Sequence, residues 1–322
     1  MTLYLKYRPI HSRDLAECLD CLRDDFAYDH AAKSHLRRFW EFGLADGGLR
    51  GLVMENELAP PGTKIYYFII KAAITHEYFV DLMTSVGPLL GRRVLELWLQ
   101  GLCPVLTGEQ LRAANSASDL PRMTMVSLFG GSPAMADPSQ ERILGNKIIE
   151  WSTYSTSGYR IQTYLLEAYG EREWNWCEAA GFSVVRTYGP EFPECVMPGR
   201  EPKLYGVTEA DLVNSPGSLS SIMLYWQPPR FDFRDTEQEL LLHAFNGDTD
   251  TELAVLLNIA PITVKKRWQS IYSKVELVDR SILVGPNEGQ NELRGLEKKR
   301  RIIQYLRHHM EELRTYNPRD MS

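Results

Sequence analysis

Apolar positions recur at two different spacings along the 322 residues of the chain. In the first two thirds, short apolar runs typical of strands alternate with segments whose apolar residues recur every three or four positions, as on one face of a helix. We predict strands at residues 4–10, 49–56, 64–74, 122–131, 158–170 and 183–188. We predict helices at residues 12–26, 31–48, 87–101, 107–118, 138–151 and 171–182. This mixed order predicts an α/β or α+β sandwich around one sheet.

The last part of the chain has a helical pattern only. Residues 248–275 predict two short helices joined by a tight turn, and Thr249 precedes Glu252 by the spacing of a capping box. Asn258 tolerates the left-handed backbone of such a turn, and Pro261 suits the first turn of the next helix. Four residues recur at helical spacing and are expected to face the core: Val264, Trp268, Ile271 and Val275.

Charge divides unevenly along the chain. The net charge is −6, but residues 228–322 hold 15 Lys and Arg against 15 Asp and Glu, so the first part carries the whole excess. The helix that begins near Pro261 has only cations up to Val275, and residues 294–301 add a second basic block. Local potential governs contact with phosphates, while total charge mainly affects solubility. An amphipathic helix with a basic outer face is what a reader of the DNA major groove needs.

Residues 233–277 resemble the LuxR-type helix-turn-helix in the order and spacing of many positions. The matching residues are Glu237, Gly247, Thr249, Glu252, Leu253, Ala254, Ile259, Ala260, Thr263, Val264, Lys265, Ile271, Tyr272, Lys274 and Val275. Two positions depart from the family pattern: Ala260 replaces the usual Ser cap, and Asp235 stands where a Pro is common. The resemblance implies that double-stranded DNA is a partner. A three-helix protein-interaction module with one basic face is the alternative.

The candidate DNA-binding residues follow from this resemblance and from the charge of the second helix. They are Thr249, Pro261, Thr263, Lys265, Lys266, Arg267, Gln269, Ser270 and Lys274. We expect Gln269 to read a base edge and the lysines to contact phosphates, because Gln can pair with adenine and Lys offers a point charge.

The first part of the chain resembles the GNAT acyltransferase fold over about 190 residues. Arg8, Pro9 and Asp14 lie in a matching first strand and helix, and Gly181 with Phe182 lies in a matching late helix-to-strand corner, which also includes Glu178. The family binds the pyrophosphate of acyl-CoA with Arg/Gln-x-x-Gly-x-Gly/Ala at a helix N-terminus, where free amides bind anions. No such motif follows the strand that ends at Phe129. We therefore expect a sensor domain that uses no cofactor and is not an enzyme.

Candidate ligand and metal residues are fewer. Four aromatic residues are candidates to line a small-molecule pocket, although core packing is the alternative: Tyr66, Phe68, Trp98 and Trp151. Cys18 and Cys21 form a C-x-x-C without a second pair at zinc spacing, so buried or half-exposed thiols are favoured over metal or redox use. No histidines have metal-ligand spacing on a predicted helix, so we expect no metal.

We divide the chain into a GNAT-like α/β domain at residues 1–189, a Pro- and Gly-rich connecting region at 190–229, and an all-α helix-turn-helix domain at 230–322. No apolar run reaches membrane-spanning length and the N-terminus has no secretory pattern, so the expected location is the cytoplasm, with no membrane partner. We also expect a homodimer. A helix at about 291–316 would join the interface or pack on its own core through Leu296, Ile303, Leu306, Met310 and Leu313.

The function predicted from the sequence is a DNA-binding transcription regulator whose first domain senses a small-molecule effector or mediates oligomerisation. The alternative is an active acyl-CoA-dependent acyltransferase that its C-terminal domain tethers to DNA.

Overall fold

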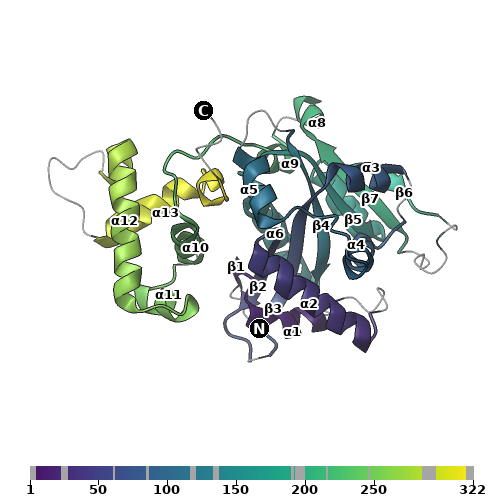
Figure 1. Ribbon diagram of the computed structural model, residues 1–322, viewed down its shortest axis with the longest axis horizontal. Coiled ribbons are helices and arrows are strands. Elements are labelled where there is room, and N and C mark those ends of the chain that lie inside the picture. Colours follow the sequence, from purple (N-terminus) through teal and green to yellow (C-terminus); the bar gives the residue numbers. More distant parts are fainter. Residues whose placement is uncertain are drawn as a thin grey trace.

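The computed structural model describes residues 5–22, 28–60, 62–84, 87–116, 121–132, 138–189, 192, 200–214, 217–245, 247–284 and 295–316, with the backbone alone at 138–141 and 213–214. Within these ranges the chain forms a sheet with helices on both faces and a separate group of helices beside it (Figure 1).

Seven strands form one sheet in the first part of the chain. They are β1 (Leu5–Pro9), β2 (Leu49–Asn56), β3 (Ile65–Ile74), β4 (Met123–Gly131), β5 (Ile161–Tyr169), β6 (Ser183–Thr187) and β7 (Pro202–Thr208). Their order in the sheet is β1-β2-β3-β4-β5-β7-β6. The pair β4·β5 is parallel, and the other neighbouring pairs are antiparallel. The register of β3 and β4 shifts between Ile70 and Lys71, so a bulge lies near the middle of the sheet.

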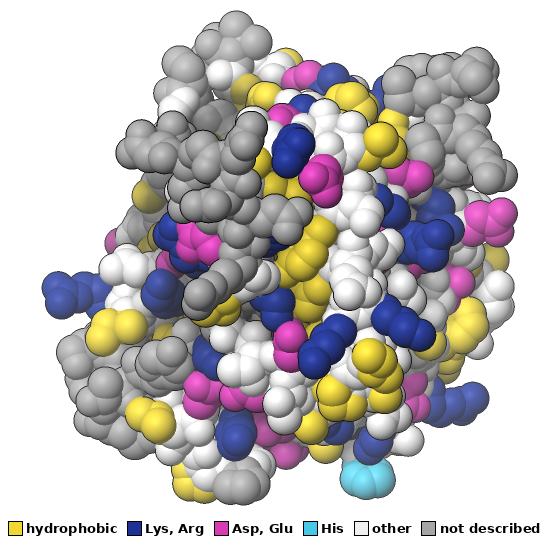
Figure 2. All heavy atoms as spheres, turned by 90° about the vertical axis from the view of Figure 1, so that its left-hand side faces the viewer, with side chains coloured by type: hydrophobic (Ala, Val, Ile, Leu, Met, Phe, Trp, Pro, Cys, Tyr) yellow, Lys and Arg dark blue, Asp and Glu magenta, His cyan; other side chains and the backbone are white. Residues whose placement is uncertain are grey.

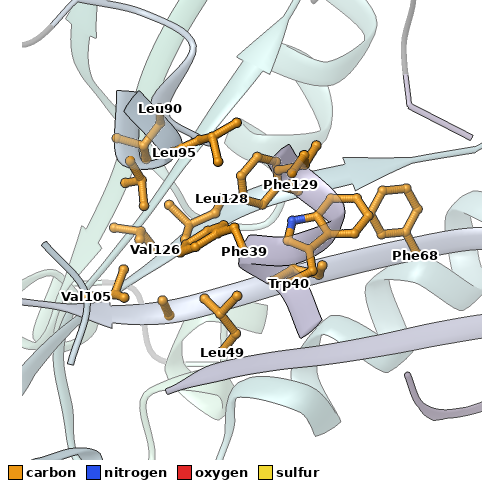
Figure 3. Close-up of a cluster of buried hydrophobic side chains, with 14 of the residues drawn as sticks. Phe39, Trp40, Leu49, Phe68, Leu90, Leu95, Val105, Val126, Leu128 and Phe129 are labelled. Carbon is orange, nitrogen blue, oxygen red and sulfur yellow. The ribbon is translucent and has the colours of Figure 1, made fainter. Parts of the chain in front are cut away.

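The helices of this part are α1 (Leu15–Asp20), α2 (His30–Asp46), α3 (His76–Thr84), α4 (Leu90–Leu99), α5 (Gly108–Ser116), α6 (Pro138–Thr156), α7 (Glu171–Ala179), α8 (Glu209–Asn214) and α9 (Leu219–Met223), preceded by the 3-10 turn η1 (Ser12–Asp14). One face of the sheet packs against α1, α2 and α4 in an aromatic core. There Trp40 lies 5.5 Å from Phe68 and 5.4 Å from Phe129 between ring centroids (Figure 3). The other face packs against α6, α7 and α9, where Tyr164 contacts Phe182.

The mixed α/β architecture and the order of its elements agree with the GNAT-like fold expected from the sequence. One boundary differs. We predicted residues 190–229 as a connecting region, whereas β7 inserts between β5 and β6 and completes the sheet. The physical reason is that seven residues of buried strand are enough to pair on both edges, while the Pro- and Gly-rich stretches on either side dominate the composition of the region.

The second part of the chain is helical. It contains α10 (Asp235–Ala244), α11 (Asp250–Leu256), α12 (Pro261–Asp279), η3 (Arg280–Leu283), α13 (Gly295–Leu306) and η4 (Met310–Leu313). Thr249 caps α11 in a capping box with Glu252, and Asn258 has a φ of +50° in the turn before α12. Val264, Trp268 and two further residues of α12, Ile271 and Val275, are buried as expected from their spacing.

The end of the chain packs on this same helical core. Leu306 is fully buried and Met310 and Leu313 are buried, but Leu296 is 80% exposed. The regular helix ends at Leu306, so the expected stripe of residues 291–316 does not continue as one helix, and residues 291–294 lie outside the described residues. Within one chain, the apolar side chains from Ile302 onward therefore stabilise the local core.

Polar contacts join the two parts. The side chain of Arg314 donates hydrogen bonds to the carbonyl oxygens of Ser157 and Tyr154 at the end of α6, and Asn115 donates to the carbonyl of Thr315. At the other end of the contact, the rings of His11 and His243 stack with centroids 5.2 Å apart. The C-terminal segment Met310–Thr315 thus lies between α10 and the sheet domain rather than extending away from it.

Candidate functional site

A gap separates β4 and β5 in the second half of each strand. The two strands pair only from Met123 to Val126 on β4 and from Ile161 to Leu165 on β5. A cavity of about 610 Å³ lies at the gap, lined by the later residues of both strands together with residues of α6 and α7. Because β4 and β5 are parallel, their carboxyl ends meet at this same point, and in open α/β sheets ligands commonly bind in such a crevice.

The cavity connects the two faces of the sheet. Successive side chains of a strand point to opposite faces. On β5, Tyr164 and Ala168 belong to the core on the α6 and α7 face, while the carboxylate of Glu167 reaches the first amide of α4 on the opposite face. All three residues line the cavity. Two reactants can therefore approach each other from opposite faces of the sheet.

Glu167 has the chemistry of a general base. Its Oε2 accepts hydrogen bonds from the amide of Leu90 and from the hydroxyl of Tyr169, both at 2.8 Å, while Oε1 is buried without a hydrogen-bond partner among the described residues. Burial raises the pKa of Glu167 to about 7, against the lowering effect of Leu90, Tyr169, the backbone of Leu89 and the charge of Arg93. A carboxyl group with a pKa near neutrality, in a cavity and with one oxygen free to accept a proton, is a candidate catalytic group.

The start of α4 is shaped to place this donor. Leu89, the residue before α4, has a φ of +67°, which is rare for any residue other than glycine. In that conformation the free amide of Leu90, at the N-terminus of the helix, donates to Glu167. Strained backbone of this kind is found mainly where a functional group must be held in place.

On the α6 and α7 face the cavity is lined by hydroxyl and aromatic groups. The hydroxyls of Ser127 and Tyr164 are 2.6 Å apart. The guanidinium of Arg172 lies 5.3 Å from the centre of the Trp176 ring at the cavity wall. A cation beside an exposed aromatic face suits a ligand that is flat and negatively charged at this end.

The four aromatic residues predicted from the sequence do not line this cavity. Phe68 lies in the core with Trp40 (Figure 3), and Trp98 packs against Phe39 with ring centroids 5.3 Å apart. Trp151 is buried against Tyr67, and Tyr66 packs in the same small cluster. The cavity-lining aromatic residue of β3 is Tyr67.

The residues predicted to bind DNA separate into two groups on the structure. Lys265, Lys266 and Gln269 are exposed on the side of α12 opposite its buried residues. By contrast, Arg267, Ser270 and Lys274 bond to α10 or to the loop before it: Arg267 to the carbonyl of Thr236, Ser270 to Glu237 at 2.6 Å, and Lys274 to Glu237 at 2.8 Å.

The three remaining predicted DNA-binding residues lie at the starts of α11 and α12. Thr249 caps α11, and Pro261 and Thr263 occupy the first turn of α12. In Figure 1, α12 lies at the far side of the helical part, away from the sheet. Figure 2 shows the molecule from this side, with Lys and Arg side chains spread among acidic and apolar ones rather than in one continuous basic surface.

The first part of the chain is a mixed α/β fold with a cavity between β4 and β5. No protein-family model matches the sequence, and no curated protein matches it. The chain is similar to solved structures over its first part. One is NAA60 of Arabidopsis thaliana in complex with acetyl-CoA, at 12% identity and a TM-score of 0.37, covering 64% of this chain and 99% of the other.

Two further solved structures cover the same part. One is the spermidine/spermine N-acetyltransferase SpeG of Vibrio cholerae, at 14% identity and a TM-score of 0.37, covering 66% of this chain and 96% of the other. The other is the C-terminal condensation domain of Ebony in complex with beta-alanyl-dopamine, at 8% identity and a TM-score of 0.42, covering 64% and 100%. Our prediction that the chain is not an enzyme is corrected here, because its structural neighbours include N-acetyltransferases.

That prediction depended on a missing sequence motif after Phe129, and residues 133–137 of this loop lie outside the described residues. The sequence does hold a signal for the site, in two charged residues within apolar strands. Glu167 is a lone charge in the apolar run of β5, and Lys71 is a lone charge in that of β3. A charge inside a strand that is otherwise apolar on both faces indicates a special environment.

We expected neither a metal site nor a membrane partner, and both expectations can be compared with the described part of the chain only. No group of three or more His, Cys, Asp or Glu that could hold a metal ion occurs in that part. No helix within the described ranges has the length and apolar character needed to cross a bilayer.

Cys18 and Cys21 are buried free thiols, and burial raises the pKa of Cys21 to about 12. Cys21 lines the cavity as a protonated thiol.

Proposed function

We propose that the chain is an acyl-CoA-dependent N-acyltransferase whose C-terminal helices bind double-stranded DNA. The single observation that carries the first half is Glu167, a carboxyl group of raised pKa with a free oxygen in a cavity that crosses the sheet. Transfer of an acyl group from a thioester to an amine needs a base for the ammonium proton, and a base works best when its pKa lies near the working pH.

The gap between the strands suits an extended acyl donor. From Ser127 to Gly131, β4 keeps its pairing with β3 but has no pairing with β5, so its backbone groups on that edge can bond a ligand. An extended chain with amide groups can bind such an edge as an added strand would. The nucleotide end of the donor would then lie toward α6 and α7, where Arg172 and Trp176 line the cavity.

The acceptor amine would approach from the face that bears α4. Oε1 of Glu167 would accept a proton from the attacking nitrogen, while the amide of Leu90 and the hydroxyl of Tyr169 hold the carboxylate in position through Oε2. The carboxylate is about half ionised at neutral pH, because burial raises its pKa to about 7. It can therefore both accept the proton and release it to solvent within a turnover.

Release of free thiol from acetyl-CoA in the presence of a panel of primary amines and polyamines tests this half of the proposal. We expect turnover above the rate without amine, and saturable binding of acetyl-CoA by calorimetry. Neither turnover nor binding with any member of the panel would contradict the proposal.

The DNA-binding half is supported by the outer face of α12. Lys265, Lys266 and Gln269 are exposed on one face, and the capped helix α11 packs against the other side of α12. Ser270 and Lys274 donate hydrogen bonds to Glu237 and so hold α12 against α10. These residues would orient the helix while the exposed ones contact DNA. A DNA-bound acyltransferase would act on proteins or small amines near its operator, as part of transcription regulation.

Homodimerisation stays a prediction of the same proposal. Helix-turn-helix proteins commonly read two half-sites related by two-fold symmetry. Since the apolar residues from Ile302 onward pack inside one chain, the contact between copies would use another surface than that stripe.

A further inference from the structure

Lys71 is a buried lysine that forms no ion pair with any acidic residue in the described part of the chain. Its side chain is on β3, on the face that packs against α6, and the residue is 2% exposed. Its Nζ contacts the hydroxyls of Ser155 at 2.7 Å and Thr156 at 2.6 Å, in the last turn of α6. No carboxylate lies within ion-pair distance of Lys71 among the described residues.

A line of hydroxyl groups connects Lys71 to the cavity. Thr156 accepts a hydrogen bond from Lys71 on one side, and on the other side its hydroxyl is near enough to that of Tyr164 to act on the pKa of Tyr164. Tyr164 bonds in turn to Ser127 at 2.6 Å, and both of these residues line the cavity. Each hydroxyl has one proton and two lone pairs, so the whole line can reverse its direction of donation.

The surroundings of Lys71 favour the neutral amine. Burial lowers its pKa well below the ordinary value, and the nearby guanidinium of Arg314 lowers it further. Tyr164, whose ring centre lies 5.2 Å from Nζ, has its own pKa raised by burial. Arg314 itself lies near the charges of Glu311 and of Arg50 on β2, and Arg50 is paired in register with Lys71. Burying an amine without a charged partner lowers the stability of the fold, and ionisable groups in such surroundings are often functional.

We propose that Ser127, Tyr164 and Thr156 form a proton path between the cavity and Lys71, and that Lys71 stores the proton that the leaving thiolate needs. This inference rests on the proposed acyl transfer. The acceptor arrives as an ammonium ion and gives one proton along the path to Lys71, which makes the acceptor a free amine. When the C–N bond has formed and the C–S bond breaks, the same path returns that proton to sulfur. The second amine proton leaves through Glu167, so the charges and protons of the cycle balance.

Two variants of adjacent residues separate this role from simple packing. Thr156→Val removes the hydroxyl that links Lys71 to Tyr164 and keeps the shape of the side chain. Ser155→Ala removes the other hydroxyl bonded to Lys71, which is not part of the path and does not line the cavity. We expect Thr156→Val to lower kcat for thiol release from acetyl-CoA by about 100-fold or more, as loss of proton transfer does. Ser155→Ala should keep kcat within about threefold of wild type, with acetyl-CoA binding measured by calorimetry unchanged in both.

Lys71→Met gives an independent result if Thr156→Val folds poorly. It removes a buried amine and keeps an unbranched side chain, so the melting temperature should stay the same or rise while kcat falls as for Thr156→Val. Equal effects of Thr156→Val and Ser155→Ala on kcat, or full activity of Lys71→Met, would overturn the proton path while leaving the acyltransferase proposal in place. A wild-type protein that binds no acetyl-CoA and shows no turnover would overturn both.

Discussion

The substitution Gly158→Ala shows how much the packing of the C-terminal segment against the sheet domain contributes to stability. The φ of Gly158 is +86°, and a Cβ added there would lie 2.4 Å from the backbone nitrogen of Glu311 and 2.6 Å from the carbonyl carbon of Met310. Real Cβ atoms do not approach backbone atoms this closely, so Gly158→Ala must displace the segment Met310–Thr315. The hydrogen bond from Arg314 to Ser157 at 3.0 Å and the one from Asn115 to Thr315 at 2.9 Å would then be lost.

The expected loss of unfolding free energy has two sources, the strained backbone of the alanine and the lost hydrogen bonds. The left-handed backbone costs about 1 kcal/mol for alanine. Loss of the Arg314 bond adds about 2 kcal/mol and loss of the Asn115 bond about 1 kcal/mol, because charged donors contribute more than neutral ones. We therefore expect Gly158→Ala to lower the free energy of unfolding by about 4 kcal/mol. Gly101→Ala is the matched control, since Gly101 has a φ of +81° and no heavy atom within 4 Å of an added Cβ.

Urea denaturation followed by circular dichroism measures both variants. In the Gly101→Ala control, the left-handed backbone alone should lower the free energy of unfolding by about 1 kcal/mol. If Gly158→Ala loses no more than Gly101→Ala, the C-terminal segment does not pack against Gly158 in solution, and the contact between the two parts of the chain is wrong.

Three further predictions concern pH, DNA and assembly. Burial lowers the pKa of His243 to about 3 and also lowers that of the stacked His11, below the ordinary value of 6.5, so the unfolded chain binds protons that the folded chain does not. Stability is therefore expected to fall as pH decreases from about 6.5 toward 3, and a slope of urea midpoint against pH that is unchanged in His243→Leu would contradict this. Lys265→Ala should weaken binding to all DNA sequences and lower the salt slope by about one unit, whereas Gln269→Ala should reduce discrimination at one base pair by about 1–3 kcal/mol. Lys64→Ala is the control, since Lys64 directly precedes β3 in the sheet domain. Gel-shift titrations in which both α12 variants match wild type and this control would refute the role of α12. Sedimentation should show a dimer, and Leu306→Asp should unfold the C-terminal helices without dissociating it; a folded monomer would instead place the buried stripe at the contact between copies.

Much of the fold was predictable, because the spacing of apolar residues along a helix or strand shows which of its faces is buried. The spacing from Val264 to Val275 predicted the buried face of α12, and Thr249 with Glu252 predicted the start of α11. These features depend on residues close together in sequence. Residues 203–214 were open to a short element within the connecting region, but their place in the sheet was not predictable, because β7 acquires its role only by pairing with β5 and β6, which are distant in the chain.

The site was less predictable for a related reason. A cavity between β4 and β5 arises where pairing stops, and no residue type marks that point. The raised pKa of Glu167 results from burial, and the first amide of α4, an element distant from β5 in the chain, bonds to its carboxylate. Aromatic residues, on which we based the predicted pocket, are as useful in a core as in a site, and Phe68 and Trp151 are core residues.

The rate of thiol release from acetyl-CoA by Glu167→Gln, measured from pH 5 to 9 beside wild type, shows whether Glu167 is the catalytic base. We expect kcat/KM of wild type to rise with pH through an apparent pKa of about 7, since the base must be ionised. Glu167→Gln should lose this dependence and about 100-fold or more of the rate. Glu178→Gln, on α7 but outside the cavity, should behave as wild type. A Glu167→Gln protein with the rate and pH dependence of wild type would contradict the assignment of Glu167 as the base.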